Sequence, residues 1–201
     1  MIAENILKKE YNNATRRKLL SIMNLAYSNT ERIQLSERGF YTERGKETLI
    51  YVRNLLVETQ IKEAIDSHSL NMKYVECKNA ADNCSHFEFE TENTIMTVSR
   101  VNRKYALPRK AVYRENLSCN NGQISLFDEE ENFKYKIHVL LTHVSNENNL
   151  SSIILGIPSA NGKYWEASID LLKELDIIVD NTNEEIPRNL YKTKKINENI
   201  M

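Results

Sequence analysis

The chain has 201 residues, of which 41% are hydrophobic and 27% are charged, and its 27 Lys and Arg residues nearly balance 28 Asp and Glu residues. A chain of this length can bury a substantial core, and the balanced charge excludes both an intrinsically disordered chain and a protein that is basic over its whole surface. Any affinity for nucleic acid must therefore come from a local patch of positive charge.

Cysteine usage and hydropathy favour a cytoplasmic location. Cys77, Cys84 and Cys119 are odd in number, which argues against the disulfide framework of a secreted protein, so we expect reduced thiols. No apolar run approaches the roughly 18 residues that cross a bilayer, and Glu4 and Lys8 interrupt the apolar core that a signal peptide needs. We therefore expect no contact with a membrane.

Two helices are predicted before residue 68. The first covers residues 3–28, with a break near Asn12 and Asn13, because apolar residues recur there at 3.6-residue spacing. This stripe consists of Leu19, Leu20, Met23, Ala26 and Tyr27. The second helix covers residues 43–67, and the polar segment 28–41 is predicted to connect the two.

From residue 69 the period changes from helical to extended. Three strands are predicted, at residues 72–77, 86–90 and 94–101. In the second of them Phe87 and Phe89 alternate with polar residues, so one face should cover the core and the other should meet solvent. Between residues 103 and 127, turn-forming residues surround a short extended piece at residues 111–114.

The stretch 133–158 is predicted to be the central hairpin of the sheet. In its first strand apolar residues alternate with Lys134, Lys136 and His138, which predicts one buried face and one wetter face. After a loop at residues 145–150, the chain is apolar on both faces, as in a strand inside a sheet.

A late helix is predicted after Gly162. Its buried face should hold Trp165, Ile169, Leu172 and Leu175, with Trp165 packed against the central hairpin. Residues 177–179 are expected to return as an edge strand.

These elements together predict an α+β fold, in which N-terminal helices pack on a mostly antiparallel sheet with a late C-terminal helix. Residues 1–68 form the helical N-terminal part, and residues 69–180 form the β-rich core with the late helix. Residues 181–201 are polar and are expected to be a loosely held tail. We expect one domain overall.

Part of the chain carries a longer pattern. It consists of Pro108-Arg-Lys-Ala-Val-Tyr-Arg-Glu-Asn-Leu-Ser-Cys-Asn-Asn-Gly-Gln, followed by Leu126-Phe127, Leu140-Leu141-Thr142-His143 and Leu155-Gly156-Ile157-Pro158. Over residues 95–170 this pattern resembles uncharacterised small proteins of low-GC bacteria, their phages and prophages. That group has no established activity, so the resemblance implies a habitat and no functional residues. The habitat favours mobile-element or phage-host conflict roles.

Glu76 and Lys78 have the Glu-x-Lys form used by metal-dependent nucleases of the restriction-enzyme type. In that chemistry the carboxylate holds a divalent ion and the lysine positions or activates water, so both must project from the same side of one strand. The pattern also needs another carboxylate, for which Asp66 is the nearest upstream candidate. Such triplets are common on solvated strand faces, so a nuclease-like enzyme is the alternative function.

The candidate metal ligands lack the spacing of a structural zinc site. His86, Glu88 and Glu90 share one predicted strand face, with Cys77 or Cys84 nearby. Structural zinc ligands come in pairs separated by about two to four residues, whereas Cys77 and Cys84 have six residues between them. We therefore expect no metal, no cofactor and free thiols.

The strongest local bias is a basic segment in which cations alternate with aromatic rings. Its candidate partner-binding residues are Arg100, Arg103, Lys104, Tyr105, Arg109, Lys110, Tyr113 and Arg114. Cations that neutralise phosphates beside rings that stack on bases suit a nucleic-acid surface, and a basic patch also suits an acidic protein. The same residues could instead solvate a loop, which is the commoner case, or pair with the acidic residues 128–131.

These patterns predict a non-enzymatic binding protein, which acts by occupying a protein or nucleic-acid surface, and the resemblance implies that it belongs to a bacterial or phage system. No motif surrounds a hydroxyl or thiol nucleophile, and the five glycines never form the cluster of a phosphate-binding loop. The leading function therefore has no catalytic residue, whereas the alternative would use Glu76, Lys78 and Asp66.

Overall fold

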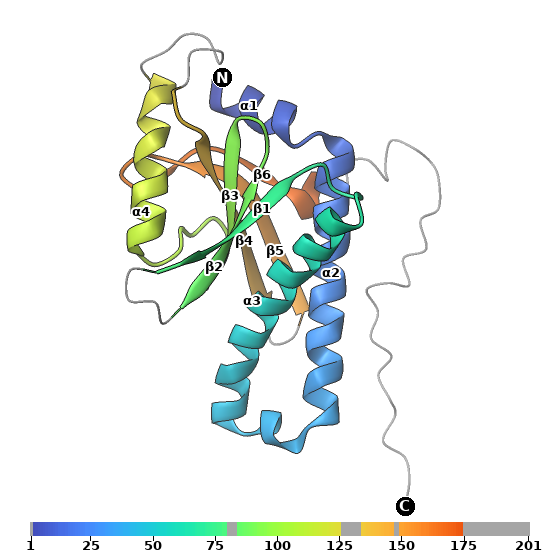
Figure 1. The fold of residues 1–201 in the computed structure, drawn as a ribbon. Coiled ribbons are helices and arrows are strands. Elements are labelled where there is room, and N and C mark those ends of the chain that lie inside the picture. Colours follow the sequence, from blue (N-terminus) through green and yellow to red (C-terminus); the bar gives the residue numbers. More distant parts are fainter. Residues whose placement is uncertain (1, 80–83, 126–133, 147–148, 175–201) are drawn as a thin grey trace, which may run out of the picture.

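The computed structural model describes residues 2–79, 84–125, 134–146 and 149–174, which form an α+β fold around a six-stranded sheet (Figure 1). The strands lie side by side in sequence order: β1 (Lys73–Lys78), β2 (Ser85–Glu90), β3 (Thr94–Arg100), β4 (Ile137–Asn146), β5 (Asn149–Pro158) and β6 (Trp165–Asp170). All neighbours are antiparallel except β3 and β4, which are parallel. A parallel pair needs a crossover connection, and here it includes α4 (Val112–Cys119). The predicted fold class is confirmed.

Three helices precede the sheet: α1 (Ile2–Glu10), α2 (Asn13–Ser36) and α3 (Glu43–Asp66). The predicted break between the first two lies at Asn12, whose side chain accepts a hydrogen bond from the Thr15 amide at 3.0 Å and so caps α2. Thr42 caps α3 in the same way, because its hydroxyl accepts from the Gly45 amide at 3.1 Å. Both caps satisfy amides that the helix itself leaves without partners.

Helix α2 is longer than predicted, because it continues to Ser36. The connection to α3 is therefore only residues 37–42, which include the short 3-10 helix η1 (Arg38–Tyr41). Residues 28–36 contain no glycine or proline to stop a helix. This end of the α2–α3 hairpin extends beyond the sheet (Figure 1), and Arg32 and Ser36 are exposed there. At the turn, a Cβ on Gly45 would lie 2.1 Å from the carbonyl oxygen of Gly39, so this close approach requires glycine.

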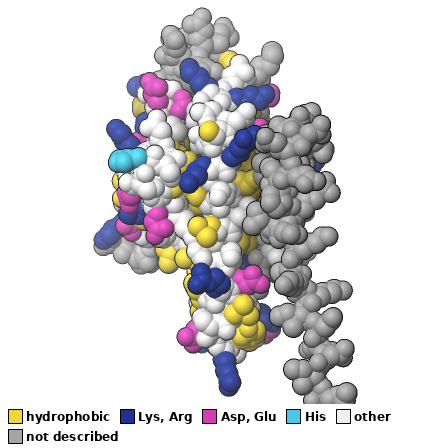
Figure 2. Space-filling model, turned by 90° about the vertical axis from the view of Figure 1, so that its right-hand side faces the viewer, with side chains coloured by type: hydrophobic (Ala, Val, Ile, Leu, Met, Phe, Trp, Pro, Cys, Tyr) yellow, Lys and Arg dark blue, Asp and Glu magenta, His cyan; other side chains and the backbone are white. Residues whose placement is uncertain are grey.

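The protruding end of the α2–α3 hairpin exposes hydrophobic side chains among charged ones of both signs (Figure 2). Leu35 is 68% exposed and Tyr41 is 53% exposed. Scattered apolar side chains of this kind are ordinary on the surface of folded proteins.

The main core lies between the sheet and the N-terminal helices. Its fully buried side chains from the sheet include Phe89, Met96, Val139, Leu141 and Leu155. Those from the helices include Leu7, Leu19, Met23, Val57 and Ile61. Tyr11 is also fully buried, and its hydroxyl shares a hydrogen bond with the Thr94 hydroxyl at 2.7 Å. The apolar side chains that recur with the strand period of two residues and those that recur with the helix period of 3.6 residues thus pack together in one core.

The opposite face of the sheet is also covered at its centre, which corrects the prediction of a wetter environment for His138, while Lys134 is exposed as predicted. His138 is 1% exposed, and its ring shares hydrogen bonds with Ser118 of α4 at 2.9 Å and Thr97 of β3 at 3.0 Å. Just beyond α4, the Asn121 side chain donates to the carbonyl oxygens of His138 and Pro158 at 3.0 and 2.7 Å. The crossover segment after β3 therefore covers the centre of the sheet face opposite the N-terminal helices.

Two segments have a different secondary structure from the predicted one. Residues 111–114 were predicted to be extended, but Val112 begins α4, in the crossover that the parallel pairing requires. Trp165 was predicted to lie on a helix, but it lies in β6, where pairing with β5 outweighs the helical spacing of the apolar residues. The late helix begins only at Leu171.

Trp165 is half-buried, whereas the prediction was a largely buried ring. Its indole packs on Gly156 of β5, where a Cβ would lie 2.6 Å from the ring, and its Nε1 donates to the Tyr105 carbonyl at 2.8 Å. The ring therefore connects β6 to the loop that follows β3.

The acidic residues 128–131, the predicted edge strand at residues 177–179 and the tail 181–201 lie outside the described residues. In the part of the chain that is described, no helix combines the length and the apolar character needed to cross a membrane.

Candidate functional site

Strands β1 and β2 form a hairpin at the edge of the sheet. Cys77 of β1 lies directly opposite His86 of β2. Only Phe89 and Glu90 of β2 pair with β3, so the end of the hairpin that holds His86 diverges from the rest of the sheet. Helix α4 lies beside this end, and the ring of Tyr113 stacks on His86 with 3.7 Å between ring centroids.

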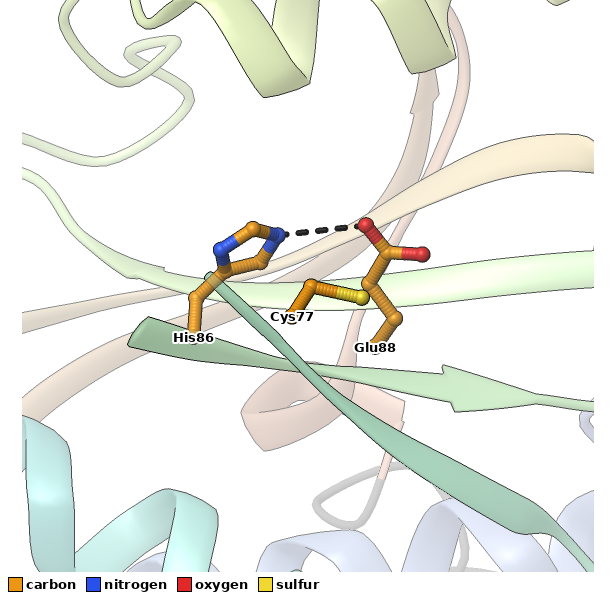
Figure 3. A group of neighbouring side chains, drawn as sticks. All are labelled: Cys77, His86 and Glu88. Atoms are coloured by element: carbon orange, nitrogen blue, oxygen red, sulfur yellow. Dashed lines mark hydrogen bonds and ion pairs between the residues drawn. The ribbon is translucent and has the colours of Figure 1, made fainter. Parts of the chain in front are cut away.

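Three potential metal ligands converge on one face of this hairpin (Figure 3). The thiol of Cys77, the imidazole of His86 and the carboxylate of Glu88 offer ligand atoms that all lie within 4.8 Å of one another. His86 Nε2 and Glu88 Oε1 are 3.1 Å apart, and these two side chains are 13% and 16% exposed. The group is thus half-buried and still reachable from solvent.

The carboxylates around Cys77 disfavour its thiolate. Burial, and then the negative charges of Glu88 and Glu90, raise the pKa of the Cys77 thiol, so without a cation it keeps its proton at neutral pH. Glu90 is held by Lys136, whose Nζ lies 2.7 Å from the carboxylate. Cys77, His86 and Glu88 are therefore the residues available to hold a metal ion at this place.

The spacing of Cys and His residues along the chain did not reveal these three ligands, because the ligands come from two different strands. The signal that could have revealed it is the predicted hairpin itself, since one strand was predicted to end at Cys77 and the next to begin at His86. Antiparallel pairing places such residues opposite one another.

The Glu-x-Lys residues lie on β1, but Asp66 does not join them in an ionic cluster. Asp66 pairs with Lys62 on α3 at 2.7 Å, and this contact lowers the pKa of its carboxyl. Glu76 accepts a hydrogen bond from the Ser85 hydroxyl at 2.8 Å. The carboxyl of Glu58 on α3 lies near Glu76. Burial, and then the negative charge of Glu76, raise the pKa of Glu58 to about 7.

Sequence reasoning missed Glu58. The predicted apolar stripe of the second helix was Leu49, Val52, Leu56, Ile61 and Ile65, with Glu58 off it. In the structure Val57 and Ile61 are fully buried, and Glu58 between them is half-buried. A carboxylate beside such a stripe lies close to the sheet that the helix covers.

The structure divides the basic segment into an exposed and a half-buried part. The exposed residues are Arg103, Lys104, Tyr105, Arg109 and Lys110, and they all precede α4. Lys104 forms an ion pair with Asp170 of β6, and Lys110 lies 3.4 Å from Glu115 of α4.

Arg100, Tyr113 and Arg114 are half-buried and engaged within the protein. Arg100 donates to the Ser145 hydroxyl at 3.4 Å, and Tyr113 stacks on His86. Arg114 donates to the hydroxyls of Ser99 (3.3 Å) and Tyr113 and, at 2.6 Å, to the carbonyl of Arg109. These three side chains therefore support the local structure.

Comparison with known proteins finds no matching family model, and no curated protein or solved structure with significant similarity to this chain. Function is therefore inferred from the residues and geometry of the chain itself.

Proposed function

We propose that the chain is a non-enzymatic binding protein of a bacterial or phage system, which acts by occupying an anionic surface of a protein or nucleic-acid partner. The observation that supports this proposal most is the β3–α4 loop, residues 101–111. This loop exposes four cations and one aromatic ring, namely Arg103, Lys104, Arg109, Lys110 and Tyr105.

The backbone of the β3–α4 loop is held at two carbonyl groups. The Tyr105 carbonyl accepts from Trp165 Nε1 at 2.8 Å, and the Arg109 carbonyl accepts from Arg114 Nη2 at 2.6 Å. Tyr105 has a φ of 59°, a left-handed conformation that residues other than glycine rarely adopt. A loop that is already ordered loses less conformational entropy when a partner binds.

The side chains of the β3–α4 loop suit an anionic partner. Within the described ranges, no ion pair involves Arg103 or Arg109, and a guanidinium can donate two parallel hydrogen bonds to a phosphate or a carboxylate. The ring of Tyr105 is 46% exposed and can stack on a base or an aromatic side chain.

A charge-reversed loop tests the proposal. The loop variant carries Arg103→Glu, Arg109→Glu and Lys110→Glu. The control reverses three exposed cations on α2, α3 and β1: Arg17→Glu, Arg44→Glu and Lys73→Glu. Both are compared with the original chain for partner capture from a bacterial lysate, after thermal melts show that they fold. We expect the loop variant alone to lose capture, and equal capture by all three proteins would refute the proposal.

The dependence of binding on salt separates the two classes of partner. For nucleic acid, capture should disappear after nuclease treatment, and removing one cation should reduce the slope of log affinity against log salt by about one unit. For an acidic protein, capture should survive nuclease, and the loop variant should mainly associate more slowly.

The alternative function, a metal-dependent nuclease-like enzyme, is favoured by one observation: Glu58 adds the carboxyl that Glu76 and Lys78 need as a neighbour. Its test is cleavage of plasmid DNA in Mg²⁺ or Mn²⁺ by the original chain and by Glu76→Gln and Lys78→Ala. Activity that both substitutions abolish would support the enzyme, and the absence of cleavage by the original chain would refute it.

A further inference from the structure

The β1–β2 hairpin brings a thiol, an imidazole and a carboxylate together from two neighbouring strands. Strand pairing sets their positions, because Cys77 lies opposite His86, and Glu88 follows two residues later on the same face. We propose that Cys77, His86 and Glu88 bind one divalent transition-metal ion of the zinc class. This site is independent of the β3–α4 loop, and each proposal can fail without the other.

The distances suit one small ion. Tetrahedral zinc holds sulfur at about 2.3 Å and nitrogen or oxygen at about 2.0 to 2.1 Å, which places its ligand atoms about 3.3 to 3.6 Å apart. His86 Nε2 and Glu88 Oε1 are 3.1 Å apart, and all three ligand atoms lie within 4.8 Å of one another. The ligand atoms therefore need to move by only about an ångström, which rotation about side-chain bonds can supply.

The donor set selects the kind of metal. Thiolate and imidazole ligands favour Zn²⁺ or Co²⁺, whereas Mg²⁺ and Ca²⁺ prefer oxygen ligands. On binding, the S–H bond of Cys77 breaks, its proton goes to solvent, and a sulfur lone pair forms the bond to the metal. The thiolate and the Glu88 carboxylate then balance the charge of a divalent ion, and water takes the fourth tetrahedral position.

The surroundings hold the ligands and limit their number. Tyr113 of α4 stacks on His86 with 25° between the ring planes, which restricts rotation of the imidazole. Glu90 projects from the same strand face, but Lys136 pairs with it at 2.7 Å and also donates to the Thr91 carbonyl at 2.8 Å. Because outer contacts of this kind orient metal ligands, they favour the three-ligand set over one that recruits Glu90.

Titration of the full chain with Co²⁺ and then Zn²⁺, under reducing conditions and after removal of bound metal, tests the proposal. The variants are Cys77→Ser, His86→Gln and Glu88→Gln. The matched control is Cys84→Ser, which removes an exposed thiol close to the site in sequence. Thermal melts of the metal-free proteins show which variants fold.

We expect one Co²⁺ per chain, a thiolate-to-cobalt charge-transfer band, and displacement of Co²⁺ by Zn²⁺ but not by excess Mg²⁺. The control should behave like the original chain. Cys77→Ser should lose the band, and each ligand variant should bind Zn²⁺ about tenfold or more weakly. The proposal is overturned if the original chain shows no charge-transfer band, or if the band survives in Cys77→Ser. If Cys77→Ser does not fold, the Zn²⁺ affinity of Glu88→Gln is the deciding measurement. An affinity about tenfold or more weaker supports the proposal, and an unchanged affinity overturns it.

Discussion

The two antiparallel hairpins β4–β5 and β1–β2 follow the same strand geometry, but the protein covers them differently. At the centre of the sheet, His143 on β4 meets Tyr27 of α2 at 2.7 Å and Asn54 of α3 at 3.0 Å, one partner for each ring nitrogen. At the edge, His86 has a ring stacked on one side and the Glu88 carboxylate 3.1 Å away. Both ring nitrogens of the buried His143 thus have partners within the protein, whereas the edge places the His86 ring beside the Cys77 thiol and the Glu88 carboxylate, three groups that could hold a metal ion.

The largest expected difference between the two hairpins is in their contribution to stability. Leu141→Ala on β4 removes a side chain that is fully buried, so it should lower the free energy of unfolding by about 3 to 5 kcal/mol. Val75→Ala on β1, where the side chain is 48% exposed, should cost less than about 1 kcal/mol. Urea unfolding of both variants measures this difference, and equal losses would mean that the edge hairpin contributes as much as the centre.

The second expected effect is a loss of stability in acid. Burial, followed by the nearby Arg114, lowers the pKa of His138 to about 3. Burial, followed by Arg53 and Arg100, also lowers the pKa of His143 to about 3. Both rings stay neutral in the folded protein, whereas in the unfolded chain they take up protons below about pH 6.5, so the free energy of unfolding falls as pH falls.

Between pH 7 and pH 5 this loss should be about 2 kcal/mol for each of the two histidines. Urea unfolding at the two pH values measures it, and His138→Gln should remove about half of the histidine contribution. A variant with the same pH dependence as the original chain would contradict the assignment of His138 as a buried neutral ring.

The smallest expected effect has the opposite pH dependence and belongs to Glu58 of α3, whose pKa is raised in part by the charge of Glu76 on the edge strand β1. The pKa of Glu58 is raised to about 7, so its contribution to stability is lost as pH rises from about 4.5 towards 7. Glu58→Gln should therefore raise the free energy of unfolding at pH 8 by about 1 kcal/mol, after allowance for partial solvent screening. At pH 4 it should change little. Destabilisation at pH 8 would show that the carboxylate has a favourable partner.

Much of the fold followed from hydrophobic periodicity. The helix break at Asn12, the start of α3 at Glu43 and the central hairpin were predicted within a few residues, because local patterns and caps decide them. Trp165 could not be placed in the same way. Its spacing to Ile169 fits a helix, and only pairing with β5 shows that the segment is a strand.

The candidate sites divide along the same line. The residues of the basic segment were visible as a compositional bias, but their division into an exposed loop and a half-buried set depends on where α4 packs. Asp66 was predicted to supply the second carboxyl near Glu76. In the folded chain the carboxyl of Glu58 lies close enough to Glu76 for its pKa to be raised by that charge. Side chains distant in sequence become neighbours only through helix and strand packing.

The sequence by itself determined the elements that depend on neighbours along the chain: the amphipathic helices, the alternating strands and the cationic composition of residues 100–114. Tertiary structure alone decided which polar groups are buried and which meet. It placed His138 beneath α4, and it set Cys77 opposite His86. The physical reason is that burial and cross-strand register depend on contacts between distant segments, and local periodicity does not encode the partner.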